Sequence, residues 1–221
     1  MSALYLIRHG QAGSRTDYDC LSETGREQAR RLGEYLAAQG VRFEAVYTGE
    51  LQRQRQTAVE AGLPEAVVDR RWNEFDLEGV YRGIAPQLAT DDPEFRQQLA
   101  ELDPNHRHWT PCDIAIVKAW IEGRYGFAGE SWIEFGARVR EGFEALRNGH
   151  ASGATVAVFT SATPMALVTA LSLGLADGPA MKLAGVTYNT AVTTLRLQPD
   201  DLTLFLFNGV AHLTPELRTF R

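Results

Sequence analysis

The chain has 221 residues and a formal net charge of -6, with 44% hydrophobic and 23% charged residues. This composition is typical of a globular protein, and the length predicts a single domain, residues 1–221, with room for an insertion. The acidic balance argues against binding of nucleic acid through bulk charge, so an anionic ligand must be met by local arginines. No apolar run approaches the roughly 20 residues that span a membrane, and the first residues lack a signal-peptide pattern, so we expect a cytoplasmic protein with no membrane partner.

Cysteine and histidine give no metal-site pattern. Cys20 and Cys112 lie far apart and are interpreted as reduced thiols, with a disulfide between them left open. His106 and His108 lie in a polar turn without a carboxylate or cysteine at ligand spacing, so we expect them to be solvated. The sequence therefore predicts no metal and no cofactor.

The first predicted element is a buried strand that ends in charged residues. The unbroken apolar run at residues 4–7 stops at Arg8, His9 and Gly10. Ligands of open α/β sheets bind at this edge, and Gly10 lets the backbone approach a ligand closely. The tripeptide predicts an anion pocket, although a lone histidine after a strand is more often a structural residue.

The next residues predict a strand–helix–strand unit. A helix is expected to begin after Ser22 or Thr24, with Thr24 and Glu27 forming a capping box, and to stop at Gly40. A strand at 44–48 follows, and this order implies a right-handed parallel crossover. A second helix opens within residues 48–58, and residues 66–69 form a third strand.

The segment from about residue 80 to residue 128 is predicted to be a helical cap insertion over the strand ends. Proline breaks are expected at Pro86, Pro93, Pro104 and Pro111, with helices at 95–102 and 113–123 between them. The segment is too short for a core of its own.

The last third predicts the remainder of the sheet. Ser131 is a candidate cap of a helix of about sixteen residues. A strong strand at 155–160 runs into Ser161 and a helix start. Residues 190–197 and 202–207 alternate around a turn at 199–201 and predict an antiparallel hairpin. The fold class is therefore α/β: a three-layer α/β/α sandwich with a mostly parallel sheet, an antiparallel edge hairpin and a helical cap insertion. The hairpin edge leaves room for a homodimer.

Several segments resemble one known family. Leu-Ile-Arg-His-Gly-Gln at 6–11 is similar to the signature of the histidine phosphatase (phosphoglycerate mutase-like) superfamily. Residues 21–29 are similar to the family's next segment, and 48–58 resemble its Ser/Thr-x-x-Leu-x-Arg-x-x-x-Thr-Ala pattern. Gly-Glu-Ser at 129–131 resembles a third family motif. The resemblance covers residues 3–79 and 129–213 and hardly touches the cap.

The resemblance implies a catalytic set. His9 would attack a phosphoryl group and become a phosphohistidine, while Arg8 and Arg53 would contact the phosphoryl oxygens. Glu74 would be the proton donor, with a pKa raised by partial burial beside aromatic residues. Arg55, about 200° further around the helix, should face elsewhere.

Further residues follow from the same resemblance. Gln11, Glu130 and Ser131 are candidates for contact with a small phosphoester or other phosphorylated substrate. Ser161 stands where the family has a second catalytic histidine and would bind phosphate as a neutral donor. His212 is another histidine near the strand ends.

Three functions stay open at this point. The first is a metal-independent phosphatase that acts through phosphohistidine on His9. The second is a weak or inactive phospho-ligand binding protein, because Ser161 lacks the charge of an imidazolium. The third is a phosphomutase, which is less favoured because the family's mutases use two histidines.

Overall fold

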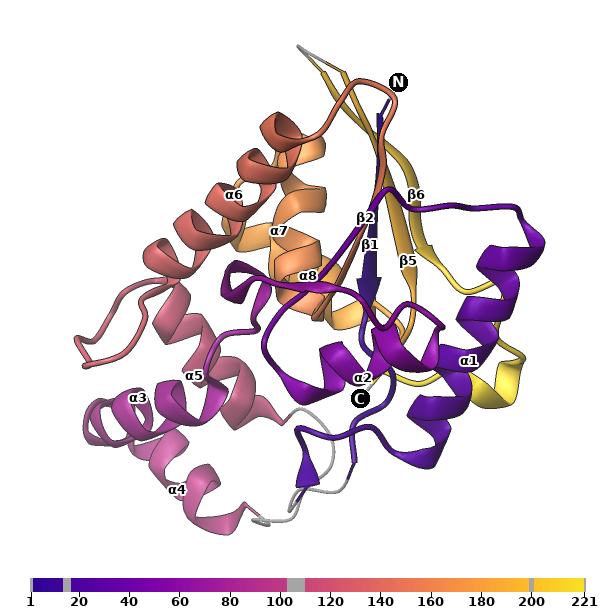
Figure 1. The fold of residues 1–221 in the computed structure, drawn as a ribbon. Helices are drawn as coiled ribbons and strands as arrows, with labels where there is room; N and C mark the ends of the chain where they lie inside the picture. Colours follow the sequence, from indigo (N-terminus) through magenta and orange to yellow (C-terminus); the bar gives the residue numbers. More distant parts are fainter. Residues whose placement is uncertain (1, 14–16, 103–109, 199–200, 221) are drawn as a thin grey trace. The chain divides into compact units, whose positions relative to one another are not determined.

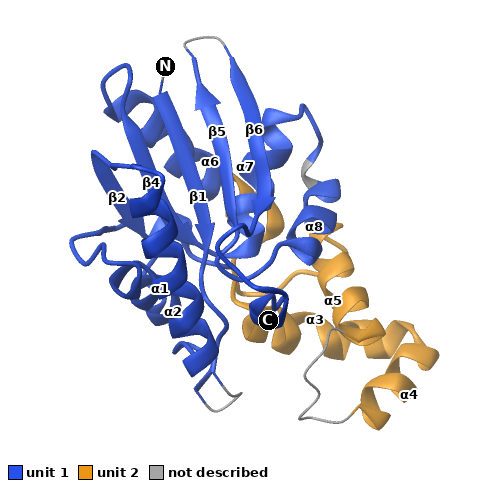
Figure 2. Ribbon diagram, turned by 90° about the vertical axis from the view of Figure 1, so that its right-hand side faces the viewer, with its two compact units in different colours: residues 1–74, 138–221 blue, residues 75–137 orange. Residues whose placement is uncertain are grey.

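The computed structural model describes residues 2–13, 17–102, 110–198 and 201–220 (Figure 1). The predicted break at Pro104, the histidines His106 and His108, and the predicted turn residues 199–200 lie outside this range. The chain divides into two compact units, residues 1–74 with 138–221 and residues 75–137 (Figure 2). We call them unit 1 and unit 2.

Unit 1 is built on a six-stranded sheet with the order β3-β2-β4-β1-β5-β6. The strands are β1 (Ser2–Arg8), β2 (Ala45–Thr48), β3 (Val67–Val68), β4 (Thr155–Thr160), β5 (Val192–Leu197) and β6 (Leu202–Gly209). β1 is parallel to β4, β4 to β2, and β2 to β3. β5 and β6 are antiparallel and continue the sheet from β1. The prediction of a mostly parallel sheet with an antiparallel hairpin is confirmed.

Helices of unit 1 cover both faces of this sheet. α1 (Glu23–Ala38) and α2 (Gln52–Glu60) lie on one face, with α7 (Ala162–Ser172) and the part of α6 (Trp132–Gly149) that belongs to unit 1 on the other (Figure 2). α8 (Asp177–Val186) packs on α7. Ile7 and Phe159 of the sheet pack with Leu32 and Leu36 of α1, all buried. The three-layer arrangement is confirmed.

Unit 2 is helical throughout its regular elements. It contains α3 (Leu77–Asp91), α4 (Pro93–Glu101), α5 (Pro111–Ile121) and the first turns of α6. Phe75, Trp120 and Phe135 form an aromatic cluster, with ring centroids of Phe75 and Trp120 4.7 Å apart.

The predicted helix break at Pro86 is wrong. Pro86 lies inside α3, where its missing N–H deprives the carbonyl of Arg82 of a partner. Both residues are exposed, so water can satisfy that carbonyl. The two predicted helices at 95–102 and 113–123 exist as α4 and α5, each beginning two residues earlier, at a proline.

The helix caps separate one correct prediction from one error. Ser22 caps α1, because its Oγ accepts the N–H of Gly25 at 3.0 Å. The capping box of Thr24 and Glu27 is therefore wrong. Ser131 and Glu134 form the reciprocal bonds of a capping box at the start of α6, as the Ser131 prediction required.

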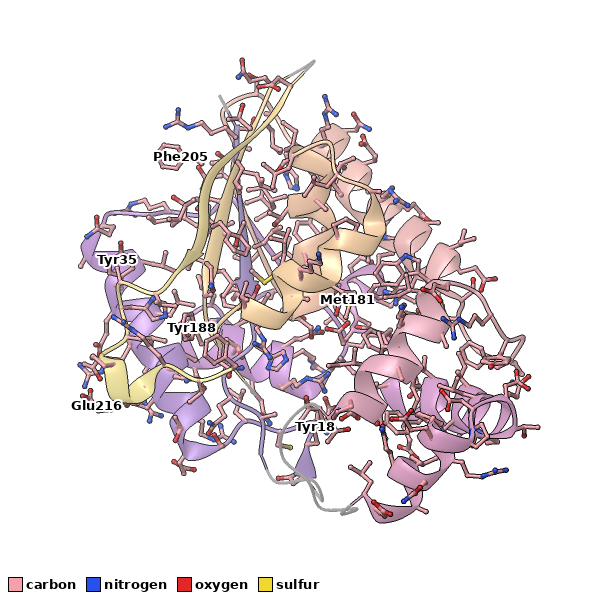
Figure 3. All side chains as sticks on the ribbon, turned by 180° about the vertical axis from the view of Figure 1, so that it is seen from behind. Tyr18, Tyr35, Met181, Tyr188, Phe205 and Glu216 are labelled. Atoms are coloured by element: carbon pink, nitrogen blue, oxygen red, sulfur yellow. The ribbon has the colours of Figure 1, made fainter. Side chains whose placement is uncertain are left out.

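β6 ends the sheet on one side and carries an exposed aromatic. Phe205 is 61% exposed and lies on the outer side of the strands (Figure 3), with the Arg196 guanidinium 4.0 Å from its ring centroid. In the described part of the chain, no helix is long and apolar enough to cross a membrane.

Candidate active site

The ends of two neighbouring parallel strands bring the candidate residues together. Arg8, the last residue of β1, is paired with Thr160, the last residue of β4. His9 and Ser161 each lie one residue further on, and the backbone N–H of His9 donates to the Thr160 carbonyl at 2.9 Å. Two polar segments separated by about 150 residues of sequence thus meet at one edge of the sheet.

His9 is a buried, neutral imidazole with a defined tautomer. Its side chain lies 2.7 Å, through Nδ1, from the Gly10 carbonyl oxygen, which can only accept, so Nδ1 carries the proton. Nε2 therefore holds the lone pair, and it accepts the Nε–H of Arg53 at 3.3 Å. Burial, followed by the charges of Arg53 and Arg8, places the pKa of His9 well below 6.5. The imidazole can act as a nucleophile through Nε2.

The turn after His9 is held by its close approach to two helices. The N–H of Gly10 donates to Thr57 Oγ1 at 2.9 Å, which joins the turn to α2. A Cβ at Gly10 would lie 2.5 Å from the carbonyl oxygen of Gly25 in α1, so only glycine fits. These contacts fix the backbone from which the His9 imidazole extends.

A strained residue supports the other side of His9. Thr190 has a φ of 54°, unusual for a β-branched residue, and its N–H donates to the His9 carbonyl at 3.3 Å. The amide of Asn189 donates to the same carbonyl at 3.2 Å. Such strain persists only where the surroundings determine the backbone, and it clusters at functional sites.

Arg53 is the guanidinium nearest the His9 lone pair. It lies in the first turn of α2, is buried, and donates from Nη1 to Asp19 Oδ1 at 2.9 Å. Its Cζ is 5.1 Å from the Tyr18 ring centroid. Arg55 is exposed on the same helix, as its spacing predicted. Asp19 and Tyr18 were not expected at the site; only their place just before the Leu21–Ala29 motif could have drawn attention to them.

Arg8 is held differently from what the resemblance implies. Its terminal nitrogens donate to backbone carbonyls, Nη1 to Thr187 and Nη2 to Phe220, the latter at 3.0 Å. Nε is buried and has no partner among the described residues. Burial lowers the pKa of Arg8 to about 10, which is still high enough to keep the group charged at neutral pH. Two of its five N–H groups are thus used by backbone carbonyls, and Arg8 presents its charge and a buried Nε–H at the strand end.

The side chain of Glu74 lies beside the N-terminus of α7. Its Oε2 accepts the backbone N–H of Thr163 at 3.1 Å, in the first turn of that helix. The carboxylate is half-buried, and its charge opposes the lowering of the Arg8 pKa. Arg8 thus lies within electrostatic reach of Glu74, Arg53 and His9.

Ser161 is buried, with 1% of its surface exposed, and contacts a residue that the sequence did not single out. Its Oγ accepts an N–H of the Gln54 side-chain amide at 2.9 Å. The sequence signal for Gln54 was only its position next to Arg53.

The remaining candidate residues make hydrogen bonds within the protein. Gln11 Oε1 accepts the Ser22 hydroxyl at 2.8 Å. Glu130 and Ser131 belong to unit 2, where the Glu130 carbonyl accepts the Trp120 indole N–H. His212 Nε2 is 3.0 Å from Thr190 Oγ1, which itself donates to the Asn189 carbonyl, so Nε2 must be the donor.

The cysteines and the other metal-ligating side chains form no cluster in the described part of the chain. Cys20 and Cys112 are both free thiols. The described residues contain no group of three histidine, cysteine or acidic side chains that could hold a metal ion. Arg8 and Arg53 supply the positive charge at the strand ends, an arrangement suited to a phosphoryl group.

The model of the histidine phosphatase superfamily (branch 1) matches residues 4–209. The chain belongs to this superfamily. Two curated relatives match shorter stretches. A broad-specificity phosphatase of Saccharomyces cerevisiae is 38% identical over 61 residues, 24% of this chain and 26% of the relative. A 2,3-bisphosphoglycerate-dependent phosphoglycerate mutase of Thermobifida fusca is 43% identical over 84 residues, 33% of this chain and 34% of the mutase.

The chain thus spans about a quarter to a third of these two relatives. Similarity to a solved structure covers more of it. A phosphoserine phosphatase variant from Entamoeba histolytica, in complex with phosphoserine, has a TM-score of 0.67 at 18% identity, covering 97% of this chain and 100% of that one. This likeness shows a shared fold, in agreement with the family match.

Proposed function

We propose that this member of the histidine phosphatase superfamily is a metal-independent phosphatase that hydrolyses a phosphomonoester through a phosphohistidine on His9. The observation that carries the proposal is the tautomer of His9: a buried, neutral imidazole whose Nε2 lone pair faces the Arg53 guanidinium. Two buried guanidinium groups supply the positive charge that a phosphoryl transfer needs.

In the first step, His9 Nε2 attacks phosphorus and the ester P–O bond breaks. The leaving oxygen takes a proton from the protonated carboxyl group of Glu74, which becomes a carboxylate. Arg53 Nε–H now donates to the same lone pair that must attack, so it must turn to a phosphoryl oxygen as substrate binds. The contact with Asp19 keeps the guanidinium close while it turns.

In the second step, water attacks phosphorus and the P–N bond breaks. The Glu74 carboxylate takes the proton from the water, which returns both residues to their starting states. Arg8 contributes its charge and Nε–H throughout, while one N–H of each terminal nitrogen stays bonded to a backbone carbonyl.

The substrate class we propose is a small phosphorylated molecule. Gln11, Glu130 and Ser131 remain predicted contacts for its organic part. They rest on the resemblance alone, since the contacts described above involve only other protein residues.

The test is acid-labile labelling of His9. The protein is mixed with a panel of ³²P-labelled phosphoesters in the presence of a chelator and quenched in alkali, and the labelled peptide is identified. We expect label on His9, release of phosphate, and loss of both in His9→Ala. His150→Ala is the matched control, because His150 bonds to Tyr47 and not to the site. Turnover that survives His9→Ala would refute the nucleophile assignment.

Two other functions have an observation in their favour. The neutral side chain of Ser161 favours a phospho-ligand binding protein, which would bind phosphoesters through Arg8 and Arg53 without labelling His9. The identity shared with the Thermobifida fusca mutase favours a phosphomutase. A mutase would pass the label from His9 to a second phosphoglycerate molecule rather than to water.

A further inference from the structure

Gln54 is a fully buried amide next to the site, with 0% of its surface exposed. Its Nε2 donates to Ser161 Oγ at 2.9 Å and to the Trp72 carbonyl at 3.1 Å. These contacts satisfy the nitrogen of the buried amide, whereas Oε1 has no partner among the described residues.

The orientation of this amide is fixed by its partners. The Trp72 carbonyl can only accept, so the nitrogen and not the oxygen of the Gln54 amide must face it. The same nitrogen then faces Ser161 Oγ. Gln54 therefore donates to Ser161, and Ser161 accepts.

This direction determines what Ser161 can do. A serine hydroxyl has one proton and two lone pairs, and one lone pair is taken by Gln54. Although Ser161 is the N-cap of α7, its side chain makes no capping bond. The hydroxyl proton has no acceptor among the described residues. His9 follows β1 as Ser161 follows β4, one residue beyond the paired Arg8 and Thr160, so the two residues lie side by side at the strand ends.

Gly49 makes the room that Gln54 needs. A Cβ at position 49 would lie 2.0 Å from Gln54 Oε1 and 2.6 Å from Asn73 Oδ1. A residue with a Cβ at position 49 would therefore displace the Gln54 amide oxygen from its present place. Gly49, Gln54 and Ser161 are thus linked: a glycine, a long amide and a short hydroxyl occupy one buried space.

We propose that Gln54 is a positioning residue that holds the Ser161 hydroxyl as a neutral donor to the phosphoryl group on His9. The pair stands where the resemblance implies a second catalytic histidine. This inference rests on the proposed phosphatase function. Ser161 would touch the phosphoryl oxygen, and Gln54 would act only through Ser161.

A neutral pair has a consequence that an imidazole does not. Neither a hydroxyl nor an amide titrates between pH 4 and 10. The pH–rate profile should therefore lack the ionisation that a second histidine would add. Ser161→His combined with Gln54→Ala, which vacates the space, should introduce that ionisation.

A double-mutant cycle tests the link. Ser161→Ala should lower kcat about 10- to 100-fold, on the lower side of the loss for one oriented donor, and Gln54→Met about tenfold. If Gln54 acts through Ser161, the double variant should be no slower than Ser161→Ala alone. Gln52→Met, the same change at an exposed position of α2, is the matched control.

The outcomes separate the two proposals. Multiplied losses in the double variant, or a Gln54→Met protein with unchanged kcat, would overturn the role of Gln54 while His9 labelling still supports the phosphatase. An unlabelled His9 in the native chain would instead overturn the phosphatase. Thermal unfolding of each variant shows whether it folds. If Gln54→Met does not fold, Gln54→Asn, which keeps the amide but shortens its reach, takes its place in the cycle.

Discussion

The ends of β1 and β4 are neighbours with opposite chemistry. β1 ends in a cation, Arg8, and is followed by the imidazole of His9, whereas β4 is followed by a hydroxyl, Ser161, bonded to the amide of Gln54. Both ends are almost equally buried, at 3% exposure for His9 and 1% for Ser161. Burial alone therefore does not make a reactive group.

The difference lies in how each end is supported. Buried charges require partners, and Arg8 and Arg53 obtain them from backbone carbonyls and from Asp19. The neutral end needs only hydrogen bonds. The charged end can thus bind and attack, while the neutral end can orient, and substitutions can weaken one end at a time.

Gly10→Ala should produce the largest effect at the charged end. The new Cβ would meet the Gly25 carbonyl, so the turn must shift and carry His9 with it. A displacement of about 1 Å costs on the order of 10²-fold in rate. The measurement is kcat/KM for an aryl phosphate. Gly185→Ala, where a Cβ meets no atom within 4 Å, should keep full activity; equal activity in both variants would contradict the prediction.

Arg53→Lys should cost somewhat less, about 10- to 100-fold in kcat/KM. Lysine keeps the charge but loses the planar group that contacts His9 and Asp19 together. Arg55→Lys is the control on the exposed face of α2, and it should change the rate by less than twofold. A similar loss in both variants would point to bulk charge rather than to the geometry of Arg53.

Asp19→Asn should have a smaller effect, about three- to tenfold on KM. The amide oxygen can still accept from Arg53, but the ionic part of the contact is lost, and Asp19 is partly exposed so solvent screens that part. Steady-state kinetics at low and high salt measure it. The native chain should lose its advantage over the variant as salt increases.

The smallest effect concerns stability in acid. Burial lowers the pKa of His212 to about 4. Between pH 6.5 and 4, this histidine is therefore protonated in the unfolded chain but neutral in the folded chain. The free energy of unfolding therefore falls as the pH falls through this window. His212→Gln removes the titration and should recover about 1–2 kcal/mol at pH 4 relative to pH 7, discounted for partial exposure. Urea unfolding at both pH values gives the difference, and an equal loss in both proteins would refute it.

The strands of the sheet could be predicted from the sequence because they are unbroken apolar runs that end abruptly. Parallel strands end at the same edge of a sheet, so the residues after β1 and β4 must meet there. The proximity of His9 and Ser161 could therefore be predicted. The helix break predicted at Pro86 was wrong because the only hydrogen bond lost is that of an exposed carbonyl, which water can satisfy.

The supporting contacts at the site could not be predicted in the same way. Gln54 and Ser161 are 107 positions apart, and Arg8 and Phe220 are 212 apart. A polar residue inside a helix has the same local pattern whether it faces water or a buried hydroxyl. Backbone carbonyls, which hold Arg8, carry no side-chain signal at all.

The contact between Gly10 and Gly25 has a consequence for recognising such sites in other sequences. A Cβ at Gly25 would lie 2.2 Å from the Gln11 carbonyl, just as one at Gly10 would strike Gly25. Both positions therefore exclude a side chain, because the turn at Gly10 and Gln11 packs against the backbone at Gly25. An arginine–histidine–glycine tripeptide is common by chance, but a second glycine fifteen positions downstream, at a helix start, would be a far stricter filter.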